Sequence, residues 1–358
     1  MKNRAKKGTL RDSSEFKDGF SDKLKPLKPL DLSRVKTIND LVTQLSYTAF
    51  GGRSVGEAAD VLCEMAKDKD CFVILTLSGA LTVAKMGLVI CDLIDNGIVG
   101  AVVSTGALMA HGFVESIGMT HFKYEKRMTD EELYYAGYDR VYDTLELEKN
   151  LDDVEIIFKN VLDKIGRKTV LSSRLINERL GEYLVKNTKT RARGILKSAF
   201  KKNVPVYIPA FTDCELGLDL GLYNRRARRQ NQKPFQFDAL IDLEDFTELA
   251  KKQKKLGIFT VGGGAPRNWA QQVSPYLDIL QKRLKGGGAF KRYTYGVRIC
   301  PEPVHWGGLS GCTYSEGISW GKFTPPHEGG RWAEVYADAT IALPLIVKAV
   351  LERLGKPR

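Results

Sequence analysis

The sequence lacks the short motifs that mark two common enzyme classes. Its 358 residues contain no H-E-x-x-H and no G-x-G-x-x-G. The first absence argues against a zinc metallohydrolase, and only four histidines are present in total. The second argues against an ordinary Rossmann dehydrogenase, whose phosphate-binding turn is built from those glycines.

Cysteine is also scarce. The six cysteines are widely spaced, and none stands in a C-x-x-C pair. Several lie in apolar segments, where cysteine behaves as a small hydrophobic residue. This pattern favours neither a disulfide framework nor a zinc site, so we expect a reducing compartment and no bound metal.

Long hydrophobic runs are missing. No apolar run approaches the roughly 20 residues that a membrane-spanning helix needs. The basic N-terminal segment MKNRAKKGTLR is not followed by an apolar stretch, so we do not interpret it as a secretory signal. We expect a cytoplasmic protein without a membrane partner.

The charge balance is basic, with 55 Lys and Arg against 43 Asp and Glu and a net charge of +12. The basic residues gather at 1–30, 224–230 and 251–255, and none of these segments interleaves aromatic residues as a base-stacking platform does. We therefore expect solvated surfaces rather than nucleic-acid binding. An acidic protein partner or a nucleic acid is the alternative explanation of the charge.

The pattern along the chain predicts an α/β fold with a single large doubly wound, Rossmann-like parallel sheet flanked by helices. Residues 1–33 lack periodicity and predict a basic extended arm, and residues 34–358 predict one domain. Continuous apolar runs predict buried strands at 71–77, 98–103, 204–209, 257–261, 293–300 and 333–337. Predicted helices include 82–95, 153–165, 169–186, 237–252 and 341–354, and a capping box at Ser54 and Glu57 predicts one more.

Small and hydroxyl-bearing residues follow most of the predicted strands. They are Ser78-Gly79, Ser104-Thr105-Gly106-Ala107, Thr212-Asp213, Gly262-Gly263-Gly264 and Asp338-Ala339. Ligands of open α/β sheets bind beyond these strand ends, where the backbone can approach dinucleotide phosphates. Asp213 or Asp338 could accept hydrogen bonds from ribose hydroxyls. The same residues are also typical of ordinary strand-to-helix turns, so the pattern leaves both interpretations open.

A second candidate site is the segment SGCTYSEGISWGK, which ends at Lys322 among Trp320, Ile318 and Phe323. Apolar surroundings desolvate a lysine, lower the pKa of its amine and make it nucleophilic toward a carbonyl or imine carbon. Trp320 could flank a cationic amine with its ring face, and Glu316 could bind an ammonium group or shuttle protons. The alternative is an ordinary surface lysine at a strand edge.

The motifs EGISWGK at 316–322 and VYADA at 335–339 resemble those of deoxyhypusine synthase. The similarity runs from about Cys71 to the C-terminus and includes the strand-end turns and the glycine triplet. The segments GGGAPRNW and WGGLSG are similar to the bacterial deoxyhypusine-synthase-like branch of that family. The resemblance implies NAD as cofactor, polyamine substrates, and a homotetramer with active sites between subunits.

The resemblance also implies roles for individual residues. Lys322 would be the catalytic lysine, and Trp320, Glu316 and Asn268 would bind the substrate. The implied NAD contacts are Ser78, Thr82, Thr105, Gly106, Asp213, Gly262, Gly263, Gly264, Asp338 and Ala339. In the family reaction, spermidine is oxidised to an imine, and the lysine displaces 1,3-diaminopropane. The butylimine then passes to an acceptor amine and is reduced by the retained NADH.

Several positions depart from the family pattern. Asn268 stands where enzymes that modify the translation factor carry a histidine, and Leu218, Trp306 and Leu309 stand where the family has acids that grip spermidine. Nearby acids that could replace them are Glu215, Asp219 and Glu302. These departures favour a free-amine acceptor such as putrescine, which gives homospermidine. A deoxyhypusine synthase acting on a protein lysine is one alternative, and a non-catalytic or altered-substrate NAD-binding homologue is another.

Overall fold

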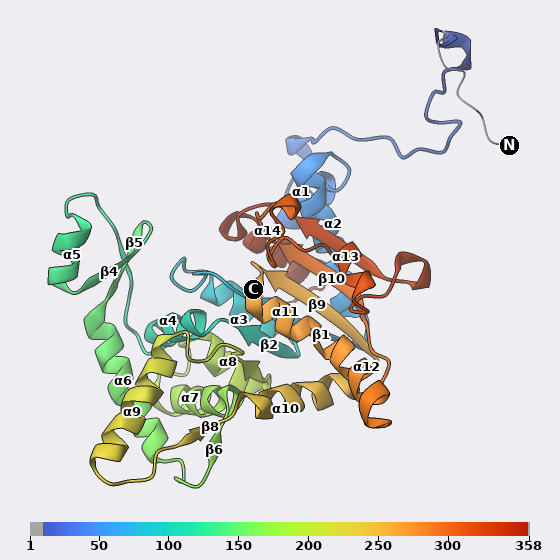
Figure 1. Ribbon diagram of the computed structural model, residues 1–358. Helices are drawn as coiled ribbons and strands as arrows, with labels where there is room; N and C mark the ends of the chain where they lie inside the picture. Colours follow the sequence, from blue (N-terminus) through green and yellow to red (C-terminus); the bar gives the residue numbers. More distant parts are fainter. Residues whose placement is uncertain (1–9, 357–358) are drawn as a thin grey trace.

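The computed structural model describes residues 10–356, which fold around a six-stranded sheet (Figure 1). The strands are β1 (Cys71–Leu77), β2 (Ala101–Ser104), β7 (Val206–Tyr207), β9 (Lys255–Val261), β10 (Tyr293–Ile299) and β11 (Arg331–Val335). Their order is β11-β10-β9-β1-β2-β7, and every neighbouring pair is parallel. The predicted α/β class with a large parallel sheet flanked by helices is confirmed.

The order of the strands defines one special position in the sheet. The chain runs outward from β1 through β2 to β7, and then crosses back to β9 on the other side of β1 before continuing to β10 and β11. This is the doubly wound arrangement, in which connections leave β1 and β9 in opposite directions. Ligands of such sheets bind beyond the carboxyl ends of the two strands where the direction reverses.

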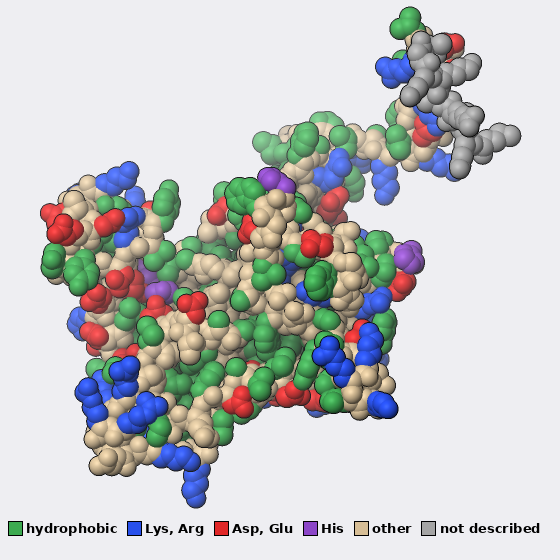
Figure 2. Space-filling model, in the orientation of Figure 1, with side chains coloured by type: hydrophobic (Ala, Val, Ile, Leu, Met, Phe, Trp, Pro, Cys, Tyr) green, Lys and Arg blue, Asp and Glu red, His purple; other side chains and the backbone are tan. Residues whose placement is uncertain are grey.

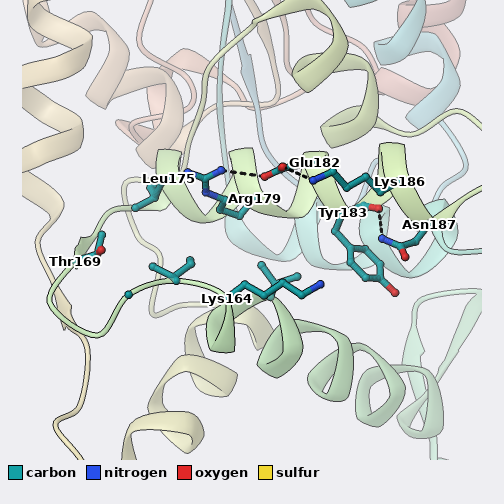
Figure 3. Close-up of a pocket in the computed structure, with 11 residues that line it drawn as sticks. Lys164, Thr169, Leu175, Arg179, Glu182, Tyr183, Lys186 and Asn187 are labelled. Carbon is teal, nitrogen blue, oxygen red and sulfur yellow. Dashed lines mark hydrogen bonds and ion pairs between the residues drawn. The ribbon is translucent and has the colours of Figure 1, made fainter.

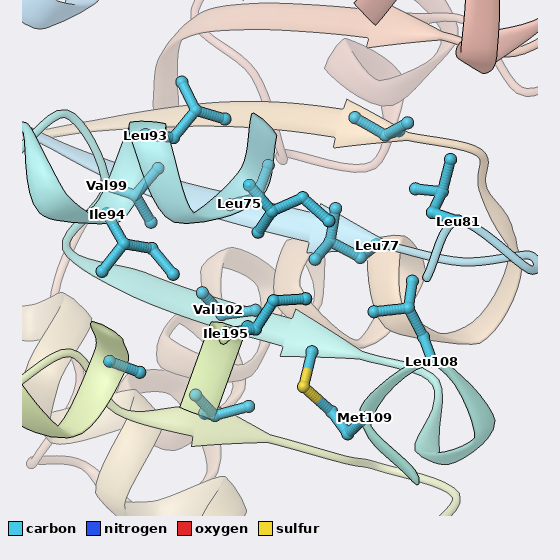
Figure 4. Close-up of a cluster of buried hydrophobic side chains, with 14 of the residues drawn as sticks. Leu75, Leu77, Leu81, Leu93, Ile94, Val99, Val102, Leu108, Met109 and Ile195 are labelled. Carbon is cyan, nitrogen blue, oxygen red and sulfur yellow. The ribbon is translucent and has the colours of Figure 1, made fainter. Parts of the chain in front are cut away.

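Helices cover both faces of the sheet, which explains why most of its strands are apolar without alternation. One face packs against α2 (Phe50–Lys67), α3 (Gly87–Asp95), α4 (Gly106–Ser116), α8 (Ile195–Lys202) and α14 (Ala339–Arg353). The other packs against α10 (Ala239–Lys251), α11 (Gly264–Gln271), α12 (Val273–Leu284) and α13 (Tyr314–Ser319). Figure 4 shows part of the larger core, where side chains of β1, β2, α3 and α4 meet.

The remaining elements surround this body. Helix α1 (Ile38–Leu45) packs on α2 and α14, while α6 (Glu148–Asp163), α7 (Ser173–Asn187) and α9 (Glu215–Arg229) pack beside α4 and α8. Strands β3 (Phe122–Lys123), β5 (Thr144–Leu147) and β4 (Tyr138–Val141) form a small antiparallel sheet, and β6 (Val170–Leu171) pairs with β8 (Gln236–Phe237). The small antiparallel sheet and α5 (Asp130–Ala136) form a lobe that stands out from the body (Figure 1).

Four predicted helix starts are wrong. Helix α6 begins at Glu148 rather than at residue 153, and α7 begins at Ser173 rather than at residue 169, because Val170–Leu171 forms strand β6 against β8.

Helix α2 begins at Phe50, so Ser54 lies inside it and does not form a capping box with Glu57. Helix α3 begins at Gly87 rather than at residue 82. The physical reason is Lys85, whose φ of 64° lies in the left-handed region and interrupts any right-handed helix.

The N-terminal segment before α1 carries two short 3-10 helices, Ser13–Glu15 and Leu32–Arg34, and reaches away from the body in Figure 1. Residues 1–9 of the predicted arm lie outside the described residues, and the domain boundary at residue 33 stays a prediction. Between residues 10 and 356, no helix has both the length and the apolar character that crossing a membrane requires.

Candidate active site

A hollow of about 230 Å³ lies beyond the carboxyl ends of β1, β2 and β9, at the position where the strand order reverses. Among the predicted cofactor residues, its walls contain Ser78, Thr105, Gly106, Asp213, Gly263 and Gly264. The Ser78 Oγ accepts a hydrogen bond of 2.7 Å from the backbone N–H of Gly263, which joins the ends of β1 and β9. We call this hollow the switch-point crevice.

Two helices begin at the switch-point crevice with free N-terminal N–H groups. Thr105 is the N-cap of α4 and Gly263 is the N-cap of α11, and neither provides a side-chain cap. The Thr105 Oγ1 is buried and has no hydrogen-bond partner. Unpaired N–H groups at the positive ends of helix dipoles, together with an unpaired hydroxyl, suit the phosphates of a dinucleotide.

The glycine triplet has structural reasons of its own. Gly262 and Gly264 have φ angles of 85° and 67°, which few other residues tolerate. A Cβ on Gly263 would lie 2.5 Å from the Cβ and 2.6 Å from the Cα of Ser310. The triplet therefore allows the loop at Ser310 to pack against the end of β9, in addition to keeping the crevice open.

The other predicted cofactor residues do not line the crevice. Thr82 is fully buried, and its hydroxyl donates to the carbonyl oxygen of Leu108 at 2.9 Å. Asp338 is the N-cap of α14, where its Oδ1 accepts a bond of 2.8 Å from the Thr340 N–H, and Ala339 is the first residue of that helix. Gly262 lies behind the crevice wall, against Ser78.

A second hollow, also of about 230 Å³, contains all four predicted catalytic and substrate-binding residues: Lys322, Trp320, Glu316 and Asn268. The Lys322 side chain is buried, with the residue only 7% exposed. Its Nζ donates to the Asn268 Oδ1 at 3.0 Å and lies 5.8 Å from the centre of a Trp320 ring. We call this hollow the lysine pocket.

Burial changes the acidity of Lys322. Desolvation lowers the pKa of its ammonium group, and the nearby Arg267 guanidinium acts in the same direction, while Cys312 and Glu316 oppose them. A lowered pKa increases the fraction of neutral amine, which is the form that attacks an electrophilic carbon. The pocket therefore suits a nucleophilic lysine better than a permanently charged one.

The local sequence explains how Lys322 reaches this position. Helix α13 ends in a Schellman motif, in which the Gly321 N–H bonds to the Ile318 carbonyl and the Lys322 N–H bonds to the Gly317 carbonyl. Gly321 takes a φ of 68°, so the glycine of SWGK is required by the turn. The Lys322 carbonyl then accepts from the Tyr293 N–H at the start of β10, which fixes the lysine against the sheet.

The same segment also fits G-x-S-x-G, at residues 317–321, a match that sequence reasoning missed. In esterases this motif places its serine on a strand-to-helix turn. Here Ser319 ends helix α13, is exposed, and donates its hydroxyl to the Glu316 carbonyl at 2.8 Å. The motif therefore does not form a nucleophile elbow.

Two buried arginines, which sequence reasoning also missed, hold the wall between the two hollows. Arg267 donates to the Cys312 carbonyl at 2.6 Å, and Arg298 donates to the Ser310 carbonyl at 2.7 Å. Ser310 lines the crevice, while Leu309 and Cys312 line the lysine pocket. The signal for Arg298 was a charge inside an otherwise apolar strand, because such a charge needs buried acceptors.

The proposed replacements for the missing acids do not reach the lysine pocket within this chain. Leu309 lines the pocket, but Glu215, Asp219 and Glu302 do not. Asp219 is half-buried on α9, where burial, with Glu155 and Glu215 nearby, raises the pKa of its carboxyl to about 7. Glu316 is therefore the acid that a cationic substrate would meet in this pocket.

A larger hollow of about 410 Å³ lies between α6 and α7 (Figure 3), yet its chemistry is different. Glu182 is paired there with Arg179 at 2.9 Å and with Lys186 at 2.7 Å. These ion pairs lie at the surface, and the residues that line the hollow include neither a buried nucleophile nor converging helix N-termini. The switch-point crevice and the lysine pocket are the better candidates.

The fold and these two hollows define an α/β protein in which a buried lysine lies beside a crevice at the carboxyl edge of the parallel sheet. Residues 40–350 match the family model described as "Deoxyhypusine synthase". The chain belongs to the deoxyhypusine synthase family. Membership supports a transferase, with aminobutyl transfer from spermidine as its reaction class.

Individual relatives agree with this assignment. A "probable deoxyhypusine synthase 2" of Methanosarcina mazei is 32% identical over 92% of this chain and 90% of its own length. A "deoxyhypusine synthase-like protein" of the bacterium Chlorobaculum parvum is 33% identical over 94% and 92%. A crystal structure assigned to a deoxyhypusine synthase of Entamoeba histolytica superposes with a TM-score of 0.58, 15% identity and coverage of 90% and 96%. The last similarity concerns the fold alone.

Proposed function

We propose that this protein is an NAD-dependent aminobutyl transferase, which moves a 4-aminobutyl group from spermidine to an acceptor amine through an imine on Lys322. The observation that carries the proposal is the buried Lys322 amine, bonded to Asn268 at 3.0 Å in a pocket that shares a wall with the switch-point crevice. A desolvated lysine is the nucleophile that imine exchange requires.

The switch-point crevice suits NAD. The free N-termini of α4 and α11 and the unpaired Thr105 hydroxyl would hold its pyrophosphate, and Asp213 would accept from a ribose hydroxyl. When bound, NAD accepts the hydride that leaves spermidine and returns one at the end of the reaction. AgrE, a protein crystallised with ornithine and NAD+, shares the fold with a TM-score of 0.50 and 12% identity over 86% of this chain and 34% of its own.

The remaining steps belong to the residues of the lysine pocket. The Lys322 amine adds to the carbon of the oxidised spermidine, the carbon–nitrogen bond to 1,3-diaminopropane breaks, and that diamine leaves with the proton that the lysine gives up. The acceptor amine then displaces Lys322 by the same exchange. Glu316 would bind the terminal ammonium group, and the Trp320 ring would flank it.

The acceptor that fits this pocket best is a small amine such as putrescine, which gives homospermidine. Asn268 occupies the position of the expected histidine, and the apolar Leu309 lines the pocket where the family carries acids. We further propose that the protein is cytoplasmic and forms a homotetramer with active sites between subunits.

The test is incubation of the purified protein with spermidine, putrescine and NAD. Homospermidine and 1,3-diaminopropane should form in equal amounts, and borohydride should trap a butyl adduct on Lys322. Label from spermidine that enters a protein band in lysate would support a protein acceptor instead. Bound NAD without turnover of any polyamine would refute the transferase and favour a non-catalytic homologue.

A further inference from the structure

A buried cluster outside both hollows brings together His111 of α4, His121 before β3 and Glu146 of β5. The His111 Nδ1 lies 3.1 Å and the His121 Nε2 lies 2.5 Å from the same oxygen, the Glu146 Oε2. The side chains are 14%, 0% and 1% exposed, and their three candidate ligand atoms lie within 4.8 Å of one another. Figure 2 shows acidic and histidine side chains close together on the side of the molecule that carries the lobe of α5, β4 and β5.

Ordinary hydrogen bonding does not satisfy the cluster. The His121 Nε2 is buried and lies 2.5 Å from the Glu146 Oε2, in a contact that departs from normal hydrogen-bond geometry. The other carboxylate oxygen of Glu146 accepts from the Asn150 Nδ2 at 2.8 Å and the Leu147 N–H at 3.1 Å. The carboxylate is thus held with Oε2 facing two imidazole nitrogens, and the three candidate ligand atoms converge in a buried place.

We propose that His111, His121 and Glu146 form a binding site for one divalent transition-metal ion, with zinc as the best fit. Two imidazoles and a carboxylate are a common zinc ligand set with an open fourth position, whereas magnesium and calcium prefer oxygen ligands. The sequence predicts no metal, because its cysteines form no C-x-x-C pair and it contains no H-E-x-x-H, and these three residues form no such motif. The site does not depend on the proposed transferase activity.

Glu215, which is not one of the three proposed ligands, also supports this assignment. Its Oε1 lies 3.8 Å from the His111 Nε2, and its Oε2 is buried without a hydrogen-bond partner. A histidine that binds a metal through one ring nitrogen usually donates the other N–H to a carboxylate, which orients the ring. With the metal on Nδ1 of His111, Glu215 is placed to act as that carboxylate.

Lys85 is the group that competes with the metal. Its Nζ lies 2.9 Å from the His121 Nδ1 and 3.2 Å from the Glu115 Oε1. An ammonium that donates to Nδ1 leaves the imidazole proton on Nε2, and that tautomer cannot bind a metal. Metal binding therefore requires Lys85 to leave His121 and keep only its pair with Glu115, which its 42% exposed side chain allows. Asp139 adds a further negative charge that faces His111.

The location of the site suggests a structural role. Its ligands come from the body and from the lobe that contains β5, so a metal would fasten the lobe to α4. Helix α4 starts at the switch-point crevice, and Glu215 begins α9 two residues after Asp213. Metal binding would therefore stiffen one side of the crevice.

The test uses the full chain, stripped with a chelator and titrated with Zn²⁺ against a chromophoric chelator, and with Co²⁺ for the visible absorption of a tetrahedral site. We expect one ion per chain, a loss of affinity of about 100-fold in Glu146→Gln, and a loss of about tenfold in Glu215→Gln. Lys85→Met should bind more tightly than the wild type, since its competing charge is gone. The exposed His327→Gln is the matched control and should change nothing.

The opposite results are equally informative. Equal Zn²⁺ affinity in wild type and Glu146→Gln, or no cobalt spectrum at all, would overturn the site. Should Glu146→Gln fail to fold, Lys85→Met decides, because unchanged or weaker metal binding in that variant would contradict the proposal.

Discussion

Asp219→Asn is expected to stabilise the protein at alkaline pH and to have little effect at acidic pH. Burial, with Glu155 and Glu215 nearby, raises the pKa of the Asp219 carboxyl from 3.8 to about 7 in the folded protein. Below about pH 4 the carboxyl is protonated in both the folded and the unfolded chain, so it does not lower the free energy of unfolding. Above pH 7 the folded state must hold a poorly solvated charge, and stability is lost as pH rises between these values.

The size of the expected change in the free energy of unfolding follows from the same difference in pKa. At 1.36 kcal/mol per pKa unit, the change from 3.8 to about 7 corresponds to at most about 4 kcal/mol. Because Asp219 is only half-buried, solvent screening reduces this to about 1–2 kcal/mol. Asparagine keeps the shape of the side chain and removes the charge, so the free energy of unfolding at pH 8.5 should rise by that amount.

Urea unfolding of wild type and Asp219→Asn at pH 4 and pH 8.5 checks the prediction. The exposed Glu178→Gln on α7 serves as control and should change the unfolding midpoint at neither pH. A variant less stable than wild type at pH 8.5 would refute the reasoning, since it would mean that the Asp219 charge has a favourable partner.

The remaining predictions concern the two hollows. Lys322→Ala and Lys322→Arg should both lose polyamine product while NAD affinity, measured by equilibrium dialysis, stays within about twofold, because a guanidinium keeps its proton and the lysine does not line the crevice. Lys322→Ala with normal product would make the lysine structural. Ser78→Ala leaves the Gly263 N–H without its acceptor, so we expect a loss of about 1–2 kcal/mol in unfolding free energy and weaker NAD binding; unchanged values for both would contradict this role. Asn268→Asp places a carboxylate next to the Lys322 Nζ, which favours the ammonium form, so the rise of kcat/KM with pH should move to higher pH; a shift to lower pH would count against the amine as nucleophile.

The fold was largely predictable from the sequence because its strongest signals are local. The central strands are largely apolar, since helices cover both faces of the sheet, whereas β10 contains Arg298 and the edge strand β11 contains Arg331 and Glu334. Ends of elements were harder to predict. Gly87 starts α3 only because Lys85 adopts a left-handed backbone, and no pattern of residue types indicates that conformation.

The candidate site also contains some residues that the sequence predicted and others that it did not. The switch-point turns at Ser78 and Gly263 follow predictable strands, and strand order then brings them together. Thr82 was assigned on the resemblance alone, and its hydroxyl instead bonds to Leu108 inside the core. The two buried arginines were missed because both donate to backbone carbonyls of the 309–312 loop, which any sequence can supply, although Arg298 also donates to the Tyr336 hydroxyl.

The histidine–glutamate cluster shows why some sites cannot be inferred from spacing. His111, His121 and Glu146 are separated by 10 and 25 positions and lie on a helix, a loop and a strand. A short motif works when a single helix or turn fixes the geometry of its residues, as the Schellman turn does for Lys322. Here the geometry depends on how the lobe packs against α4, which only the folded chain determines. Lys322 could therefore be predicted from seven consecutive residues, whereas the cluster could be identified only in the folded structure.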